Sequence, residues 1–213
     1  MSSDVLPGAL LTATALSGLL VFDAKGRWVP WLLKPVASAG FLWVALSCGA
    51  LETTYGQTVL FALASCWLGD VLLIPKGARR TFLAGLASFL LGHLVFVVAF
   101  GMGAFSWPWS AMAAVVVVPA GVVALRWLRP HVSRSFAGPV LAYVLVISAM
   151  VLAAAGASGA TGRQVILVGA VAFFLSDLAV ARERFVTKTA WNRVWGLPLY
   201  YVATVLLATS VAG

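Results

Sequence analysis

Hydrophobic residues run along this chain in eight long stretches separated by short polar breaks. A helix needs about 20 predominantly apolar residues to cross the hydrocarbon core of a bilayer, and most of the stretches approach this length. The pattern therefore predicts an all-α, polytopic membrane protein with eight transmembrane helices, which we expect to form one domain over residues 1–213. The expected spans are residues 5–22, 35–51, 57–74, 81–103, 107–125, 136–155, 164–181 and 196–212.

Prolines punctuate this pattern. Pro75, Pro130 and Pro198 fall near expected helix ends. Pro119 lies inside the fifth span, where it removes a backbone hydrogen bond and should kink the helix.

Composition supports a membrane location. Of the 213 residues, 62% are hydrophobic and 9% are charged, whereas a typical soluble domain has about 25% charged residues. The net charge of +8 comes from short loops, which fits a membrane surface better than a nucleic acid. Lys25 and Arg27 follow the first apolar stretch, so we expect a retained first helix and no cleaved signal peptide.

The basic residues also predict an orientation. Thirteen of the fourteen lie in four alternate loops, and Arg163 alone lies on the other side. By the positive-inside rule these four loops face the cytoplasm and both termini are extracytoplasmic, as expected in a bacterial inner membrane. The thirteen are Lys25, Arg27, Lys34, Lys76, Arg79, Arg80, Arg126, Arg129, Arg134, Arg182, Arg184, Lys188 and Arg193.

Two aspartates lie inside apolar spans, Asp70 in the third and Asp177 in the seventh. A carboxylate in lipid is costly, so it usually marks a functional site. Both follow the same short pattern, Leu-Gly/Ser-Asp, shortly before a basic loop. At 1.5 Å per residue, both lie roughly 7–9 Å below the cytoplasmic edge. We therefore predict that the two carboxyls face one pocket that opens toward the cytoplasmic leaflet.

Other polar residues belong near this pocket. Lys34 marks the expected cytoplasmic start of the second helix, and Tyr200 and Tyr201 enter the last helix at about the level of the aspartates. His93 lies thirteen residues after Arg80, or about 20 Å, nearer the midplane. A satisfied core histidine and a catalytic one both fit its position, and the tyrosines also fit plain interfacial aromatics.

Stripes of small residues lie beside these polar groups, and such stripes let helices approach closely. They predict that the third, fourth and seventh helices pack together. The stripes are Ala62, Ser65 and Gly69, and Gly85, Ser88 and Gly92.

At these residues the chain resembles the YhhN family of eight-helix membrane proteins, whose characterised members are lysoplasmalogenases. The most specific match is GAVAFFLSDLAVARERF at residues 169–185. One departure is Thr204, where the family typically has Gln after the paired tyrosines of the last helix. The other matches are Lys34-Pro35, Gly69-Asp70, Phe89-Leu90-Leu91-Gly92-His93, the segment from Tyr143 to Met150, and Tyr200-Tyr201.

The resemblance implies cleavage of the vinyl-ether bond of a lysoplasmalogen to a fatty aldehyde and glycerophospho-ethanolamine or -choline. Such a reaction parallels glycoside hydrolysis, in which one carboxyl donates a proton and another stabilises the cation or activates water. Asp70 and Asp177 would be the catalytic carboxyls, with His93 assisting. Residues expected to contact the lysophospholipid are Lys34, Tyr143, Ser176, Tyr200 and Tyr201.

This chemistry requires no cofactor. A metal held by Asp70, Asp177 and His93 is the weaker interpretation, because His93 lies at a different depth. The expected partners are the lysophospholipid substrate and membrane lipids, with no nucleic acid.

Two other classes of function fit the polar residues. A proton-coupled transporter would also use carboxylates and a histidine as a relay, although no second polar layer continues to the outer face. A non-catalytic lipid-binding protein would need the pocket but not paired acids.

Overall fold

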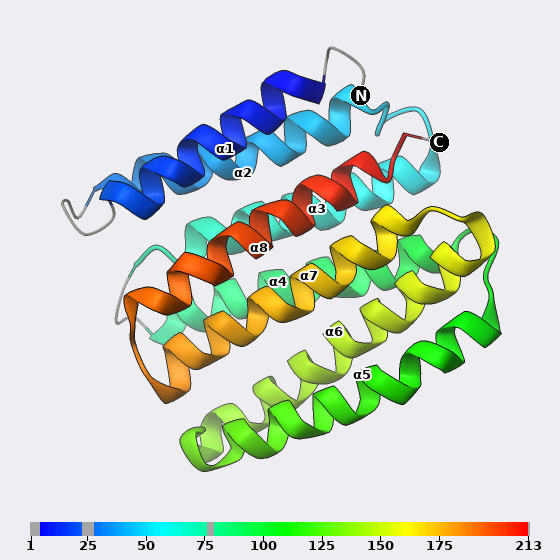
Figure 1. Ribbon diagram of the computed structural model, residues 1–213. Coiled ribbons are helices and arrows are strands. Elements are labelled where there is room, and N and C mark those ends of the chain that lie inside the picture. The colour runs from blue at the N-terminus through cyan, green and yellow to red at the C-terminus, as the bar shows by residue number, and fades with distance from the viewer. Residues whose placement is uncertain (1–4, 23–27, 76–78, 213) are drawn as a thin grey trace. The chain divides into compact units, whose positions relative to one another are not determined.

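The computed structural model describes residues 5–22, 28–75 and 79–212. Within these ranges the chain forms eight α-helices and no strand, which confirms the predicted fold class (Figure 1). The helices are α1 (Val5–Phe22), α2 (Val29–Ser47), α3 (Thr54–Leu72), α4 (Arg79–Gly101), α5 (Trp107–Leu128), α6 (Arg134–Thr161), α7 (Gln164–Ala181) and α8 (Ala190–Thr209).

Six of these helices are long and apolar enough to cross a bilayer, and the other two are α3 and α8. These two also carry predicted site residues, Asp70 on α3 and the tyrosine pair on α8. A helix that packs mainly against protein can carry polar groups that lipid would penalise. Predicted site residues also lie on four of the six more apolar helices, α2, α4, α6 and α7.

The bounds of α1 and α7 match the predicted spans, whereas α2 and α8 each begin six residues earlier than expected. In α2, Pro30 lies in the first turn, where a helix does not need its N–H, and Pro35 lies inside the helix. Pro198 likewise lies inside α8 and not near its end. The prediction that Lys34 marks the start of α2 is therefore wrong, because a helical turn precedes it.

Helix α6 also continues past its predicted end, from residue 155 to Thr161. The added residues include two glycines, Gly156 and Gly159. A Cβ at Gly156 would lie 2.2 Å from the Phe105 ring, and one at Gly159 would lie 2.2 Å from the Trp109 ring. These glycines therefore make room for aromatic side chains at the start of α5.

The chain divides into two compact units, residues 1–96 with 204–213 (unit 1) and residues 97–203 (unit 2). The expectation that all eight helices form one domain stays a prediction. So does the membrane orientation, and three of its basic residues, Lys25, Arg27 and Lys76, lie outside the described residues.

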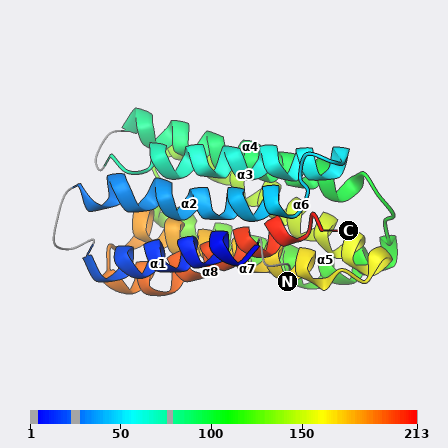
Figure 2. The same ribbon diagram turned by 90° about the horizontal axis from the view of Figure 1, so that it is seen from above.

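In unit 1, α2 packs against α1 on one side and α3 on another. Figure 2 shows α3 and α4 side by side. A Cβ at Gly69 on α3 would lie 2.6 Å from the Phe89 ring on α4, and Ser88 donates a 2.7 Å hydrogen bond to the backbone oxygen of Ser65. The small residues thus bring α3 and α4 together as predicted. The expected packing of α7 against these helices stays a prediction.

In unit 2, α6 packs against both α5 and α7. The α7–α8 corner includes one turn of π-helix, Arg182–Val186. A Cβ at Gly196 on α8 would lie 2.4 Å from the Ala179 Cβ on α7. The two helices therefore approach closely just beyond this corner.

Candidate active site

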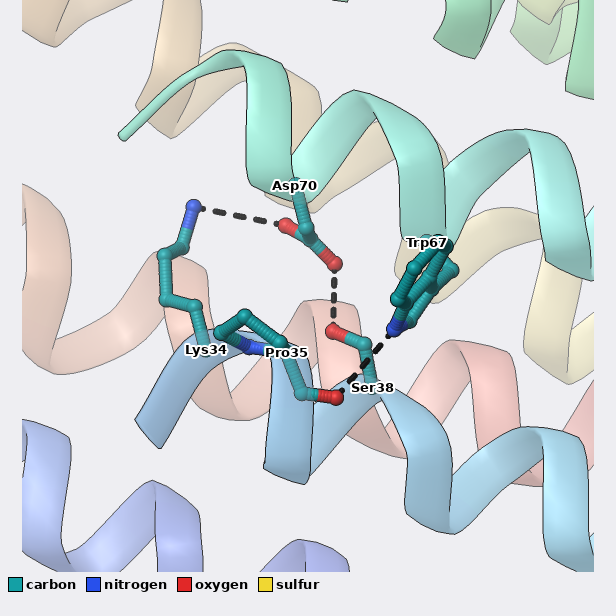
Figure 3. Close-up of polar contacts among 5 residues, drawn as sticks. All are labelled: Lys34, Pro35, Ser38, Trp67 and Asp70. Atoms are coloured by element: carbon teal, nitrogen blue, oxygen red, sulfur yellow. Dashed lines mark hydrogen bonds and ion pairs between the residues drawn. The ribbon is translucent and has the colours of Figure 1, made fainter. Parts of the chain in front are cut away.

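Asp70 lies near the C-terminal end of α3, and its carboxylate is buried against α2. Its Oδ1 atom is 3.3 Å from the Lys34 ammonium, and its Oδ2 atom accepts a 2.7 Å hydrogen bond from the Ser38 hydroxyl (Figure 3). Lys34 and Ser38 are four residues apart on α2, so they occupy the same helix face. One face of α2 thus supplies a donor to each oxygen of Asp70.

A second polar link lies beside this ion pair. The Trp67 indole on α3 donates a 3.2 Å hydrogen bond to the backbone oxygen of Pro35 on α2 (Figure 3). Trp67 precedes Asp70 by three residues, so both side chains reach α2 from one face of α3. The two links together fix the rotation of α3 against α2.

The structure changes the environment expected for Lys34. Its side chain is 18% exposed and its ammonium faces Asp70. The predicted contact between Lys34 and the substrate stays a prediction. Sequence analysis did not identify Ser38, although its four-residue spacing from Lys34 was a usable signal.

Asp177 on α7 is half-buried and has a different partner. The Tyr143 hydroxyl on α6 donates a 3.0 Å hydrogen bond to its Oδ2 atom. Tyr143 was predicted to bind substrate, and the structure places it on a carboxyl expected to be catalytic. The neighbouring Ser176 is buried and donates a 2.8 Å hydrogen bond to the Phe173 backbone oxygen within α7.

Tyr200 and Tyr201 are both buried on α8. The ring of Tyr200 packs edge-on against Phe173 of α7, with centroids 5.4 Å apart, and against Tyr201 at 4.9 Å. Phe173 lies about one turn before Asp177 on the same helix, so the Tyr200 ring packs against α7 about one turn from the position of Asp177. Their burial favours a role inside the protein over that of interfacial aromatics.

Hydrogen bonds join the end of α7 to the start of α8. The orientation prediction places this corner on the cytoplasmic side. The Asn192 amide donates to a Glu183 carboxylate oxygen at 2.7 Å and to the Thr187 backbone oxygen at 2.8 Å. Its amide oxygen accepts from the Arg182 guanidinium. Glu183, to which sequence analysis gave no special role, also accepts from the Thr189 N–H at 3.1 Å.

His93 is fully buried on α4 in unit 1. It follows Gly92, whose Cβ position would lie 2.9 Å from the Cys66 sulfur of α3. His93 therefore lies on α4 at a point where α4 packs closely against α3. Its catalytic role stays a prediction.

Four of the predicted site residues thus form two pairs, each built around one carboxyl. Within unit 1 the structure brings Lys34 to Asp70, and within unit 2 it brings Tyr143 to Asp177. The prediction that the two carboxyls share one pocket stays a prediction. A pocket of about 360 Å³ lies elsewhere in unit 1, and its lining, which includes Cys48, Glu52 and Thr209, contains none of the predicted site residues.

Known proteins resemble this chain along most of its length. Human lysoplasmalogenase TMEM86B is 31% identical over 186 residues, which cover 86% of this chain and 75% of that protein. Bovine lysoplasmalogenase TMEM86A is 28% identical, covering 88% and 80%, and a lysoplasmalogenase of Mycobacterium tuberculosis is 30% identical, covering 84% and 70%. No solved structure matches this chain.

The sequence model of the YhhN family matches residues 29–211, which run from the start of α2 to just beyond α8. This range contains every predicted site residue, from Lys34 to Tyr201. The eight α-helices of the described residues agree with the eight helices expected from the resemblance. The chain therefore belongs to the YhhN family.

Proposed function

We propose that this protein is an integral membrane hydrolase that cleaves the vinyl-ether bond of lysoplasmalogens. The products are a fatty aldehyde and glycerophospho-ethanolamine or -choline. Relatives named lysoplasmalogenase, about 30% identical over most of both chains, support this substrate class. The observation that carries the chemistry is the pair of carboxyls on apolar helices, each with its own polar partner.

Hydrolysis of a vinyl ether begins with protonation of carbon. One carboxyl gives a proton to the double-bond carbon farther from the ether oxygen, which leaves an oxocarbenium ion. Water adds to this ion as it loses a proton to the second carboxyl, and a hemiacetal forms. Transfer of the hemiacetal hydroxyl proton to the departing glycerol oxygen then releases aldehyde and alcohol, so one water is consumed overall.

Asp70 and Asp177 are the residues we assign to these two steps. General acid–base catalysis needs the reacting groups within hydrogen-bonding reach of the substrate atoms. Both carboxyls lie on helices, which hold side chains more firmly than loops do. His93 assists by hydrogen bonding or proton transfer.

The depth predicted for the aspartates suits a lysolipid. Its vinyl ether lies just below the headgroup, a few ångströms into the hydrocarbon, where sequence analysis places both carboxyls. The phosphate would then lie near the level of the loop arginines, whose charge attracts anionic headgroups.

We place the basic loops on the cytoplasmic side, so cysteines introduced at positions 79 and 184 should react with membrane-impermeant reagents only after the membrane is opened.

Incubation of detergent-purified protein with lysoplasmalogen, followed by aldehyde detection, tests the proposed function. The matched control is a lysophospholipid with an acyl ester in place of the vinyl ether. It should turn over poorly, because ester cleavage needs a nucleophile and oxyanion donors that the sequence motifs do not supply. Comparable ester hydrolysis would contradict the mechanism, and substrate flux into proteoliposomes without cleavage would favour a transporter.

A further inference from the structure

Both oxygens of the Asp70 carboxylate are already engaged by side chains of α2. The Lys34 ammonium lies at 3.3 Å from one oxygen and the Ser38 hydroxyl donates to the other at 2.7 Å. Asp70 and Ser38 are buried, and Lys34 is mostly covered. Charge-assisted contacts of this kind are stronger than neutral ones and have a defined geometry.

These two contacts suit one of the two carboxyl tasks better than the other. A group that protonates carbon must carry its proton on an oxygen that faces the substrate. In Asp70, one oxygen is the anionic partner of the Lys34 ammonium, and the other accepts a hydrogen bond from the Ser38 hydroxyl. An anion held in a fixed orientation is what the oxocarbenium ion and the attacking water require.

We propose that Lys34 and Ser38 are positioning residues that hold Asp70 as the anionic carboxylate of the reaction. Asp70 then stabilises the oxocarbenium ion and takes the proton from water, and Asp177 is the remaining candidate for the acid that protonates carbon. This assignment rests on the proposed function. It also changes the role of Lys34, which would act through Asp70 and not as a ligand of the substrate phosphate.

The two roles of Lys34 predict different kinetic effects. Loss of a phosphate ligand weakens substrate and transition state alike, so it raises KM and leaves kcat unchanged. Loss of a positioning residue leaves the headgroup contacts intact and slows the chemical step, so it lowers kcat and leaves KM unchanged. Steady-state kinetics on lysoplasmalogen therefore separates them.

Lys34→Met, Lys34→Arg and the control Lys188→Met form the first set of variants. Lys188 is exposed at the α7–α8 corner and was assigned to the same side of the membrane. Lys34→Met should lower kcat by about 10- to 100-fold, by analogy with the cost of losing a group that orients a metal ligand. The KM of Lys34→Met should stay within about twofold of the wild-type value. Lys34→Arg should recover most of the wild-type kcat, and Lys188→Met should have wild-type kcat and KM.

A matched pair of serine variants tests the second contact. Ser38 and Ser88 are both buried and each donates one 2.7 Å hydrogen bond, Ser38 to the Asp70 carboxylate and Ser88 to the Ser65 backbone oxygen. Ser38→Ala should lower kcat by about 10-fold with little change in KM, because Asp70 loses the hydroxyl that orients its Oδ2 atom. Ser88→Ala should retain nearly wild-type kcat while losing similar thermal stability.

These outcomes decide the inference separately from the proposed function. A rise in KM with unchanged kcat in Lys34→Met would make Lys34 a phosphate ligand and overturn the inference. Full activity in both Lys34→Met and Ser38→Ala, with Asp70→Asn inactive, would overturn it and leave the proposed function intact. Full activity in Asp70→Asn would overturn the two-carboxyl mechanism, whereas absence of aldehyde release by the wild-type protein would overturn the proposed function itself. If Lys34→Met fails to fold, Ser38→Ala with its control Ser88→Ala still decides.

Discussion

The two helical aspartates follow the same sequence pattern but have different surroundings. Asp70 is buried, and both of its oxygens contact α2, one through a lysine and the other through a serine. Asp177 is half-buried and accepts a hydrogen bond from the neutral phenol of Tyr143. A shared Leu-Gly/Ser-Asp string therefore does not imply a shared role. The partners come from neighbouring helices: Lys34 pairs one carboxyl with a cation, and Tyr143 donates to the other from a neutral phenol.

The largest expected effect is the loss of activity when either carboxyl is neutralised. Asp70→Asn and Asp177→Asn should each slow vinyl-ether cleavage by at least 10²–10⁴-fold, the usual contribution of general acid–base catalysis. Asn keeps the size and most of the hydrogen bonding but can neither donate a carboxylic proton nor act as an anion. Aldehyde release by purified, folded variants measures this, and full activity in either would show that only one carboxyl works.

His93 gives a smaller effect in the same assay. If the imidazole assists and the carboxyls carry the reaction, His93→Ala should lower kcat less than either Asn variant does. Circular dichroism must first show that the variant keeps its helices, because the imidazole is fully buried. A loss as large as that of the Asn variants would make His93 a third essential group and weaken the comparison between the two carboxyls.

Stability should distinguish the two carboxyl environments. Lys34→Met leaves the buried Asp70 carboxylate without its cation, and breaking a buried pair from one side costs about 3–5 kcal/mol. The partial exposure of Lys34 places its cost toward the lower end. The double variant Lys34→Met/Asp70→Asn removes the stranded charge and should recover much of the loss. Thermal unfolding in detergent measures both, and equal stability of the single and double variants would mean that the ion pair contributes little.

Tyr143→Phe should have the smallest effect on stability. It removes one donor from a half-buried carboxyl, which costs about 1–3 kcal/mol. The same unfolding assay should therefore rank Tyr143→Phe above Lys34→Met in stability. The reverse order would contradict the contrast drawn between the two environments.

The sequence predicted the helices better than their partners. Apolar stretches gave the bounds of α1 and α7, and the small-residue stripes predicted the close packing of α3 and α4. The predicted span of α2 began at Pro35, whereas the helix begins at Val29 and contains Pro35. Within a helix the loss of one backbone hydrogen bond at proline is tolerated when neighbouring groups compensate.

The contacts of the site depended on information that hydropathy lacks. The Lys34–Asp70 ion pair joins two helices, so no residue spacing within one helix reveals it. Lys34 was also predicted to mark a helix start, where a lysine is expected to contact headgroups or solvent and not another helix. Asn192 on α8 was not predicted to matter, because its partners, Arg182 and Glu183, lie in the π-helical turn that follows α7. The sequence alone does not distinguish a polar residue that is solvated near a loop from one that is hydrogen-bonded to neighbouring residues.

The central claim is that a carboxyl protonates carbon and water then breaks the ether bond. The most direct test is to run the reaction in D₂O and trap the aldehyde at once by reduction for mass spectrometry. Authentic aldehyde incubated with Asp177→Asn under the same conditions measures background exchange. The account predicts one deuterium from solvent on the carbon next to the former carbonyl, above that background. Aldehyde formed without that deuterium would contradict it.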